Sequence, residues 1–138
     1  MKMMYTYKIK EIAKVVDGDT IDVIIDLGFG LTKKERVRVA GIDTPESRTR
    51  DLYEKKLGLE AKDWLDKQLR RSDLTIKTEK EGKYGRILGW LFTEEFSKSL
   101  NEVMVDKGYA WEYDGGKKEK DYNELKEKRI SDGSWIEE

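Results

Sequence analysis

The sequence contains neither cysteine nor histidine. Without cysteine the protein cannot form a disulfide, a thiolate nucleophile or a cysteine-ligated zinc site. Without histidine, acid–base chemistry near neutral pH is left to carboxylates, and a bound metal ion would be held by oxygen ligands. If the protein has a catalytic site, these two absences favour a carboxylate base and a hard cation.

An excess of charge of one sign is also absent, as are long apolar runs. The 28 Lys and Arg residues nearly balance the 29 Asp and Glu residues, and the net charge is −1. Any anion-binding site must therefore come from a local arrangement of charges. No segment has the length of a membrane span, and residues 1–10 lack the apolar centre of a secretory signal. We expect a cytoplasmic protein with no membrane partner, although a secreted form whose signal has been removed stays open.

The chain is long enough for one domain with its own core, and we expect residues 1–138 to form it. Alternating apolar residues predict strands at residues 5–16, 21–25, 33–41, 74–78 and 87–92. Apolar spacing and capping residues predict helices at residues 59–70, 99–105 and 117–129. Residues 47–58 are polar and predict a mobile loop. The pattern predicts an α+β fold with a mainly β core: a five-stranded OB-fold Greek-key barrel with about three peripheral helices.

The most informative stretch is residues 36–46, Arg-Val-Arg-Val-Ala-Gly-Ile-Asp-Thr-Pro-Glu. Its alternation predicts the end of a strand, with Val37, Val39 and Gly41 on one face. Pro45, the only proline in the chain, ends this strand because it has no N–H for a ladder and restricts the residue before it.

Two carboxylates and a hydroxyl follow directly, on Asp43, Thr44 and Glu46, and Arg38 lies on the approach to them. Carboxylates and a guanidinium held by one rigid element suit a hard cation and a phosphate. Asp-Thr-Pro-Glu is also a good turn and helix start, and taken alone this structural interpretation is the better one.

Other charged residues favour the cation and phosphate site over the purely structural interpretation. Asp17 and Asp19 flank a turn glycine, and Arg86 precedes a predicted strand. Each has a structural explanation by itself, as a turn former or a surface charge. Together with residues 38–46 they supply carboxylates for a metal ion, a spare carboxylate as a base, and two arginines for a phosphate.

The order and spacing of these motifs resemble the staphylococcal nuclease (thermonuclease) family. The resemblance rests on Val-Asp-Gly-Asp-Thr at residues 16–20, on residues 38–46 ending in Asp-Thr-Pro-Glu, and on Lys-Tyr-Gly-Arg at residues 83–86. It extends to residues 58–61 and 99–108. One motif is moderately specific, whereas three in this order are a strong signal. The family fold, an OB-type barrel with helices, agrees with the strand and helix pattern.

The resemblance implies a role for each matching position. Asp19 and Asp43 match calcium carboxylates, and Thr44 matches the residue that supplies its backbone carbonyl. Asp17 matches a nearby acid that shapes the turn or the surroundings of the metal ion. Glu46 matches the residue that orients or deprotonates the attacking water.

The remaining matching positions would contact the substrate. Arg38 and Arg86 match the pair that grips the scissile phosphate, where two guanidinium forks stabilise the charge of the transition state. Lys83 and Tyr84 match positions near the nucleotide's terminal phosphate. Tyr113 is the candidate for stacking on a base.

These roles imply a calcium-dependent phosphodiesterase that hydrolyses DNA and RNA with little sequence specificity, prefers single strands and leaves 3′-phosphate products. We expect a monomer, with Trp111 in its core. The alternative is a non-catalytic OB-type module that binds nucleic acid or protein. Such a module should lack at least one catalytic residue, and none of Asp19, Arg38, Asp43, Glu46 and Arg86 is missing.

Overall fold

The computed structural model describes residues 4–71, 73–79 and 87–137. Five strands close into a barrel in the order β1–β2–β3–β6–β5. These strands are β1 (Met4–Asp17), β2 (Thr20–Gly28), β3 (Leu31–Val39), β5 (Leu74–Glu79) and β6 (Ile87–Thr93). β3 and β6 pair in parallel, and the other neighbours are antiparallel. This is the strand order of a five-stranded OB barrel, so the predicted fold is confirmed.

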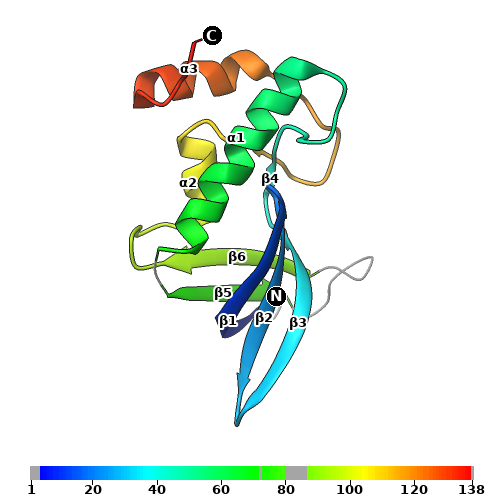
Figure 1. Cartoon of the computed structure of the whole chain (residues 1–138), viewed down its shortest axis with the longest axis vertical. Helices are drawn as coiled ribbons and strands as arrows, with labels where there is room; N and C mark the ends of the chain where they lie inside the picture. The colour runs from blue at the N-terminus through cyan, green and yellow to red at the C-terminus, as the bar shows by residue number, and fades with distance from the viewer. Residues whose placement is uncertain (1–3, 72, 80–86, 138) are drawn as a thin grey trace.

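Three helices gather at one end of the barrel (Figure 1). They are α1 (Leu52–Leu69), α2 (Leu100–Asp106) and α3 (Tyr122–Asp132). Beside them, β4 (Ile42–Asp43) and β7 (Trp111–Glu112) form a separate two-stranded sheet, which the sequence pattern did not predict. Among the described residues, no helix has both the length and the apolar character needed to cross a membrane.

Apolar residues from alternate strand positions fill the barrel, and α1 and α2 close it. The main core includes Ile21, Val23, Val37, Val39, Ile76, Leu91, Ala61, Leu65, Leu100 and Met104. A second cluster joins the start of α1 to β7 and α3 through Leu57, Trp111 and Leu125. Trp111 therefore lies in a core, as predicted. The helices are held to the barrel by burial of apolar surface.

The predicted loop at residues 47–58 is wrong in its second half, because α1 begins at Leu52. Asp51 caps the helix by accepting hydrogen bonds from the N–H groups of Tyr53 and Glu54. The face that α1 buries in its first two turns carries Glu54, Leu57 and Gly58. An acid and a glycine break the apolar periodicity, and this is why the prediction started the helix at residue 59.

The predicted strand at residues 33–41 is also wrong at its end. β3 stops at Val39, and Gly41 turns the chain with a φ of 76°. Ala40 is buried and Gly41 is exposed, the reverse of the predicted alternation. A left-handed residue at this point suits glycine, and it starts β4 in a new direction.

The last helix begins later than the predicted residue 117. Asp121 caps α3, and Gly133 ends it with a φ of 82°. Residues 113–121 are consequently not helical but form an irregular loop between β7 and α3, with a bend at Gly115 and Gly116. Two of its three lysines, Lys118 and Lys120, form ion pairs with Asp43 in β4 and Glu54 in α1.

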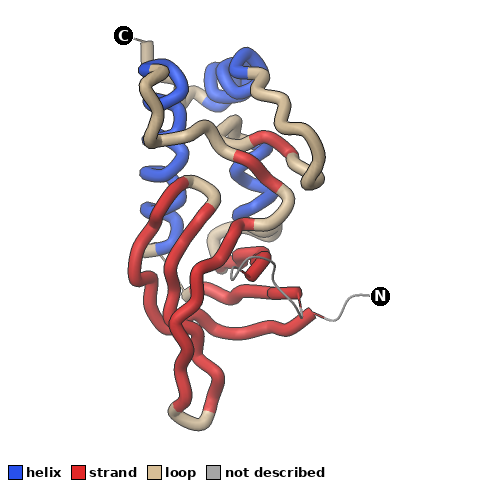
Figure 2. Tube along the Cα trace, turned by 90° about the vertical axis from the view of Figure 1, so that its right-hand side faces the viewer, coloured by secondary structure: helices blue, strands red, loops and turns tan. Residues whose placement is uncertain are grey.

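The β2–β3 hairpin extends away from the helices and ends in a narrow tip (Figure 2). Phe29 at the tip is fully exposed, with a relative exposure of 103%, and its φ is 56°. It is the one residue other than glycine with a positive φ in the described part of the chain.

Candidate active site

A cavity of about 330 Å³ opens where the β1–β2 turn, β3 and the loop after β4 meet. Its wall holds four carboxylates and three cationic side chains. These are Asp17, Asp19, Asp43, Glu46, Arg38, Arg48 and Lys118, and Thr44 lies beside them. The fold thus brings the charged residues of two separate sequence motifs, around residues 17–20 and 38–46, to one place.

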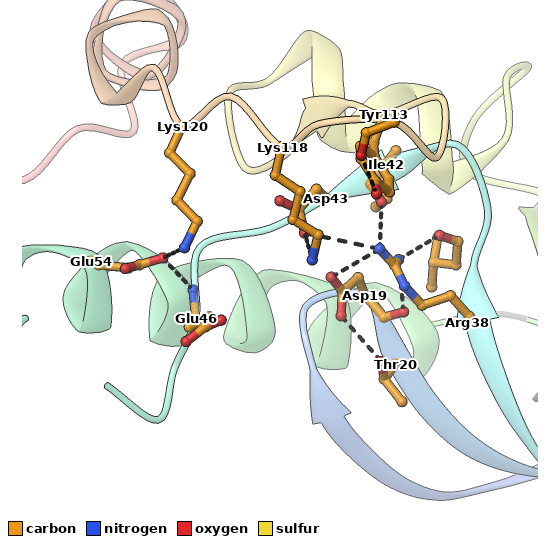
Figure 3. A network of polar contacts seen from close by, with 12 residues as sticks. Asp19, Thr20, Arg38, Ile42, Asp43, Glu46, Glu54, Tyr113, Lys118 and Lys120 are labelled. Atoms are coloured by element: carbon orange, nitrogen blue, oxygen red, sulfur yellow. Dashed lines mark hydrogen bonds and ion pairs between the residues drawn. The ribbon is translucent and has the colours of Figure 1, made fainter. Parts of the chain in front are cut away.

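Arg38 is the centre of this arrangement (Figure 3). Its Nη1 donates to the carbonyl of Val39 at 2.9 Å, and its Nη2 donates to the carbonyl of Ile42 at 2.9 Å. These bonds hold the turn between β3 and β4. The same Nη2 lies 3.5 Å from Asp19 Oδ2 and 3.9 Å from Asp43 Oδ1. One guanidinium therefore fixes the turn and faces both carboxylates.

Asp19 and Asp43 point toward the same place from different elements. Asp19 lies in the turn between β1 and β2 and accepts a hydrogen bond from the Thr20 hydroxyl at 3.1 Å. Asp43 lies in β4, opposite Trp111 in β7, and its side chain is only 7% exposed. Their convergence on a single cationic nitrogen shows that the two carboxylates can share one positive charge.

This donor set fits a calcium ion in its chemistry. Calcium takes six to eight oxygen ligands in a flexible shell. Asp19 and Asp43 would supply carboxylate oxygens, and the buried Thr44 follows directly in the chain with its carbonyl. Within the described residues no three acidic side chains are grouped closely enough to hold a metal ion by themselves. The rest of the shell would come from water and substrate.

Glu46 is exposed, and its backbone is held by a second carboxylate. The Glu46 N–H donates to Glu54 Oε2 at 3.2 Å, and Lys120 Nζ donates to the same oxygen at 2.8 Å. Burial raises the pKa of the Glu54 carboxyl, but the Lys120 ammonium and the Glu46 N–H favour its charged form more strongly. The net pKa of Glu54 lies below its ordinary value, and the same hydrogen bond raises the pKa of Lys120.

Gly58 allows the loop that carries Glu46 to lie against α1. A Cβ at this position would stand 2.5 Å from the backbone carbon and oxygen of Glu46. Only glycine permits that approach, although its position inside a helix is otherwise unfavourable. On the other side, the hydroxyl of the buried Ser47 donates to Asp17. The loop is thus held from α1 and from the end of β1.

Tyr113 lies next to this cavity. It borders a larger one of about 600 Å³, also lined by Asp43 and Lys118. Its hydroxyl donates to the carbonyl of Gly116 at 2.8 Å, and Lys118 Nζ lies 5.6 Å from the centre of its ring. The structure therefore brings Tyr113 close to Asp43. Three other predicted residues, Lys83, Tyr84 and Arg86, lie outside the described residues.

Comparison with known proteins agrees with this arrangement. The family model described as "Staphylococcal nuclease homologue" matches residues 36–131, well over half of the chain. The chain belongs to the staphylococcal nuclease family. The matched region contains Arg38, Asp43, Thr44 and Glu46, whereas Asp17 and Asp19 precede it.

Three relatives of this nuclease-family chain show how far the similarity extends. A micrococcal nuclease of Shigella flexneri is 30% identical over 110 residues, covering 75% of this chain and 57% of its own length. A thermonuclease of Staphylococcus hyicus is 34% identical over 109 residues, covering 76% and 57%. The staphylococcal-like nuclease CAN1 of Arabidopsis thaliana is 36% identical over 109 residues, covering 76% and 31%. The chain spans about a third to just over half of the length of these relatives.

Three residues that border or support the candidate site were missed by sequence reasoning: Glu54, Lys118 and Lys120. Glu54 and Lys120 are 66 positions apart, and no local pattern connects them. Lys118 and Lys120 belong to a Lys-Lys-Glu-Lys run that suggests the exposed start of a helix. The one available signal was the Gly115-Gly116 pair, which opposes a helix starting immediately after it.

Proposed function

We propose that this chain is a calcium-dependent phosphodiesterase that hydrolyses DNA and RNA with little sequence specificity. One observation carries the proposal. Asp19, Asp43 and Glu46 share a cavity with the Arg38 guanidinium, in a chain that has no histidine. This combination supplies oxygen ligands for a hard cation, a cationic fork for a phosphate and a further carboxylate, that of Glu46, for a water molecule.

Each residue has a distinct task in the proposed reaction. Bound calcium would polarise the phosphoryl group as a Lewis acid. The guanidinium of Arg38 binds a phosphate oxygen and stabilises the charge that develops on it. Glu46 accepts a proton from the attacking water as the water oxygen bonds to phosphorus. The bond from phosphorus to the 5′-oxygen then breaks, this oxygen takes a proton from solvent, and a 3′-phosphate remains.

The other predicted substrate contacts extend this proposal along the strand. Arg86 would support Arg38 at the phosphate, and Lys83 and Tyr84 would contact the terminal phosphate, as the family resemblance implies. Tyr113 borders the larger cavity, whose wall continues to Asp43. A base of a single-stranded substrate would stack on its ring. A monomer suffices for this arrangement, because one chain supplies every proposed residue.

Cleavage of single-stranded DNA, with and without calcium, tests the proposed function. We expect cleavage with calcium, its loss when chelator is in excess, and its return when calcium is restored. The ends of the products should carry 3′-phosphates, which a phosphatase-sensitive shift in mobility detects. DNA that is bound but never cut under any of these conditions would favour the binding-module alternative.

A further inference from the structure

A lysine from the segment between β7 and α3 reaches the carboxylate of Asp43. Lys118 Nζ lies 3.3 Å from Asp43 Oδ1, and the side chains are 49% and 7% exposed respectively. The same oxygen is 3.9 Å from Arg38 Nη2. Asp43 Oδ1 therefore already faces two positive charges, one of them on a long and half-exposed side chain (Figure 3).

The backbone around Lys118 is anchored on both sides. Before it, the Tyr113 N–H donates to the carbonyl of Gly41 at 2.9 Å. After it, Trp111 Nε1 donates to the carbonyl of Asp121 at 2.9 Å, and Lys120 holds Glu54. The segment therefore stays across the site while the Lys118 side chain can change its partner. Movement of one lysine side chain is enough to leave Asp43 with Arg38 as its remaining cationic partner among the described residues.

Lys118 also lies at the boundary between the two cavities. The smaller cavity holds Arg38 and Glu46, the larger one holds Tyr113, and both are lined by Asp43 and Lys118. A polynucleotide that runs from the proposed catalytic cavity to the proposed stacking tyrosine must pass this point. The group of the substrate that an ammonium would bind there is a backbone phosphate.

We infer that Lys118 is a substrate-binding residue that exchanges Asp43 for a nucleic-acid phosphate when a divalent cation binds. This inference rests on the proposed function. A cation on the Asp43 oxygen would repel the ammonium only a few ångströms away, and the lysine leaves to find a new anion. By linkage, calcium binding then strengthens nucleic-acid binding, and nucleic acid strengthens calcium binding by the same factor.

Calorimetric titrations of Lys118→Met and Lys117→Met test this exchange. Lys117→Met is the matched control, because it removes the same charge from the adjacent position. Lys117 lines the larger cavity and makes no ion pair within the described part of the chain. Three titrations are made: calcium alone, a nuclease-resistant phosphorothioate tetradeoxynucleotide alone, and the same tetranucleotide in the presence of calcium. None of them measures turnover.

We expect Lys118→Met to bind calcium alone about 2- to 5-fold more tightly, because a competing half-exposed ion pair is gone. The same variant should bind the tetranucleotide about 3- to 10-fold more weakly in calcium. The factor by which calcium strengthens tetranucleotide binding should therefore be smaller in Lys118→Met than in the parent protein. Lys118→Arg should retain the coupling, and Lys117→Met should match the parent protein in the calcium titration.

Two results would overturn the inference. If Lys118→Met and Lys117→Met behave alike in all three titrations, the contact with Asp43 is incidental. If calcium binds more tightly but the tetranucleotide binds as before, Lys118 competes with the metal ion without contacting the substrate.

A parent protein that takes up no calcium would instead overturn the proposed function itself. Unchanged thermal unfolding of each variant shows that the fold is intact.

Discussion

Lys118 and Lys120 are neighbours on one segment, and both reach a buried carboxylate, but the two ion pairs differ. Lys120 Nζ lies 2.8 Å from Glu54 Oε2, and the Lys120 side chain is 34% exposed. Lys118 Nζ lies 3.3 Å from Asp43 Oδ1, and the Lys118 side chain is 49% exposed. Glu54 receives a further hydrogen bond from the Glu46 N–H. Asp43 instead faces a second cationic side chain, that of Arg38.

The difference separates a structural half of the candidate site from a chemical half, the half that we propose to carry the chemistry. Glu54 and Lys120 line neither cavity, and their charges satisfy each other. Asp43 and Lys118 line both cavities, and Asp43 is shared between Lys118 and Arg38. A carboxylate with several loose partners can accept a new cation at low cost. A carboxylate whose hydrogen bonds are made is better suited to holding a loop.

The largest effect is expected in the chemical half, from Glu46→Gln. The amide cannot take a proton from water, so cleavage of single-stranded DNA should fall about 10²- to 10⁴-fold. Binding of the phosphorothioate tetranucleotide should change less than about threefold, since the amide keeps the shape of the side chain. The matched control is Glu119→Gln, an exposed residue that lines only the larger cavity. Equal cleavage by the two variants would remove Glu46 from the reaction.

Arg38→Lys should produce the next largest effect. A lysine carries the charge but cannot donate to the carbonyls of Val39 and Ile42 while it faces a phosphate. We expect cleavage to fall about 10- to 100-fold, with a loss of about 1–2 kcal/mol in the free energy of unfolding.

Arg36→Lys is the control for this change. Arg36 lies two residues earlier in β3, half exposed, and its Nε donates to Asp22 at 2.8 Å on the outer surface. Its loss should leave cleavage nearly unchanged. Similar losses of cleavage in both arginine variants would mean that Arg38 acts only by stabilising the strand.

In the structural half, Glu54→Gln should lower stability more than it lowers catalysis. The variant loses the charged partner of Lys120 and weakens the acceptor for the Glu46 N–H. We expect the free energy of unfolding to fall by about 1–2 kcal/mol, measured by urea denaturation, and cleavage to fall less than tenfold. Calcium affinity should stay as in the parent protein. A calcium affinity that falls together with stability would show that the two halves are not separate.

The smallest expected effect is in the pH dependence of stability. The pKa of Glu54 lies below its ordinary value of 4.5. A lowered carboxyl pKa contributes stability that is complete above the unfolded value and is lost as the pH falls through the folded one. The stability difference between parent protein and Glu54→Gln should therefore shrink below about pH 4.5. Urea denaturation between pH 3 and 6 measures it, and a constant difference across that range would contradict the Lys120–Glu54 pairing.

The barrel could be predicted because buried residues alternate in several of its strands, as Ile21, Val23 and Ile25 do in β2 and Leu74, Ile76 and Thr78 do in β5. Asp19, Arg38, Asp43 and Glu46 could be placed together because each belongs to a short motif at a strand end. The start of α1 could not be predicted, since its buried face contains Glu54 and Gly58 for reasons found only in the loop packed against it.

The contacts that cross the site could not be predicted either. Lys118 and Lys120 reach carboxylates on β4 and α1, and these pairs depend on β4 pairing with β7. A two-residue strand carries no periodicity that a sequence pattern can detect. A prediction that does not include this small sheet cannot define the path of residues 113–121. The charged residues then favour a helix from residue 117, which is incorrect.

The hairpin tip offers an experimental use that the cysteine-free composition makes possible. Phe29 is fully exposed, and the strand β3 places Leu31 and Arg38 ~20 Å apart along its length. Phe29→Cys would create the only thiol in the molecule. The positive φ at this position is unfavourable for every residue other than glycine, phenylalanine included, so cysteine adds no new backbone strain. A dye or a tether attached there would report on single molecules, or hold them on a surface, while the candidate active site faces solvent at the opposite end of the ribbon.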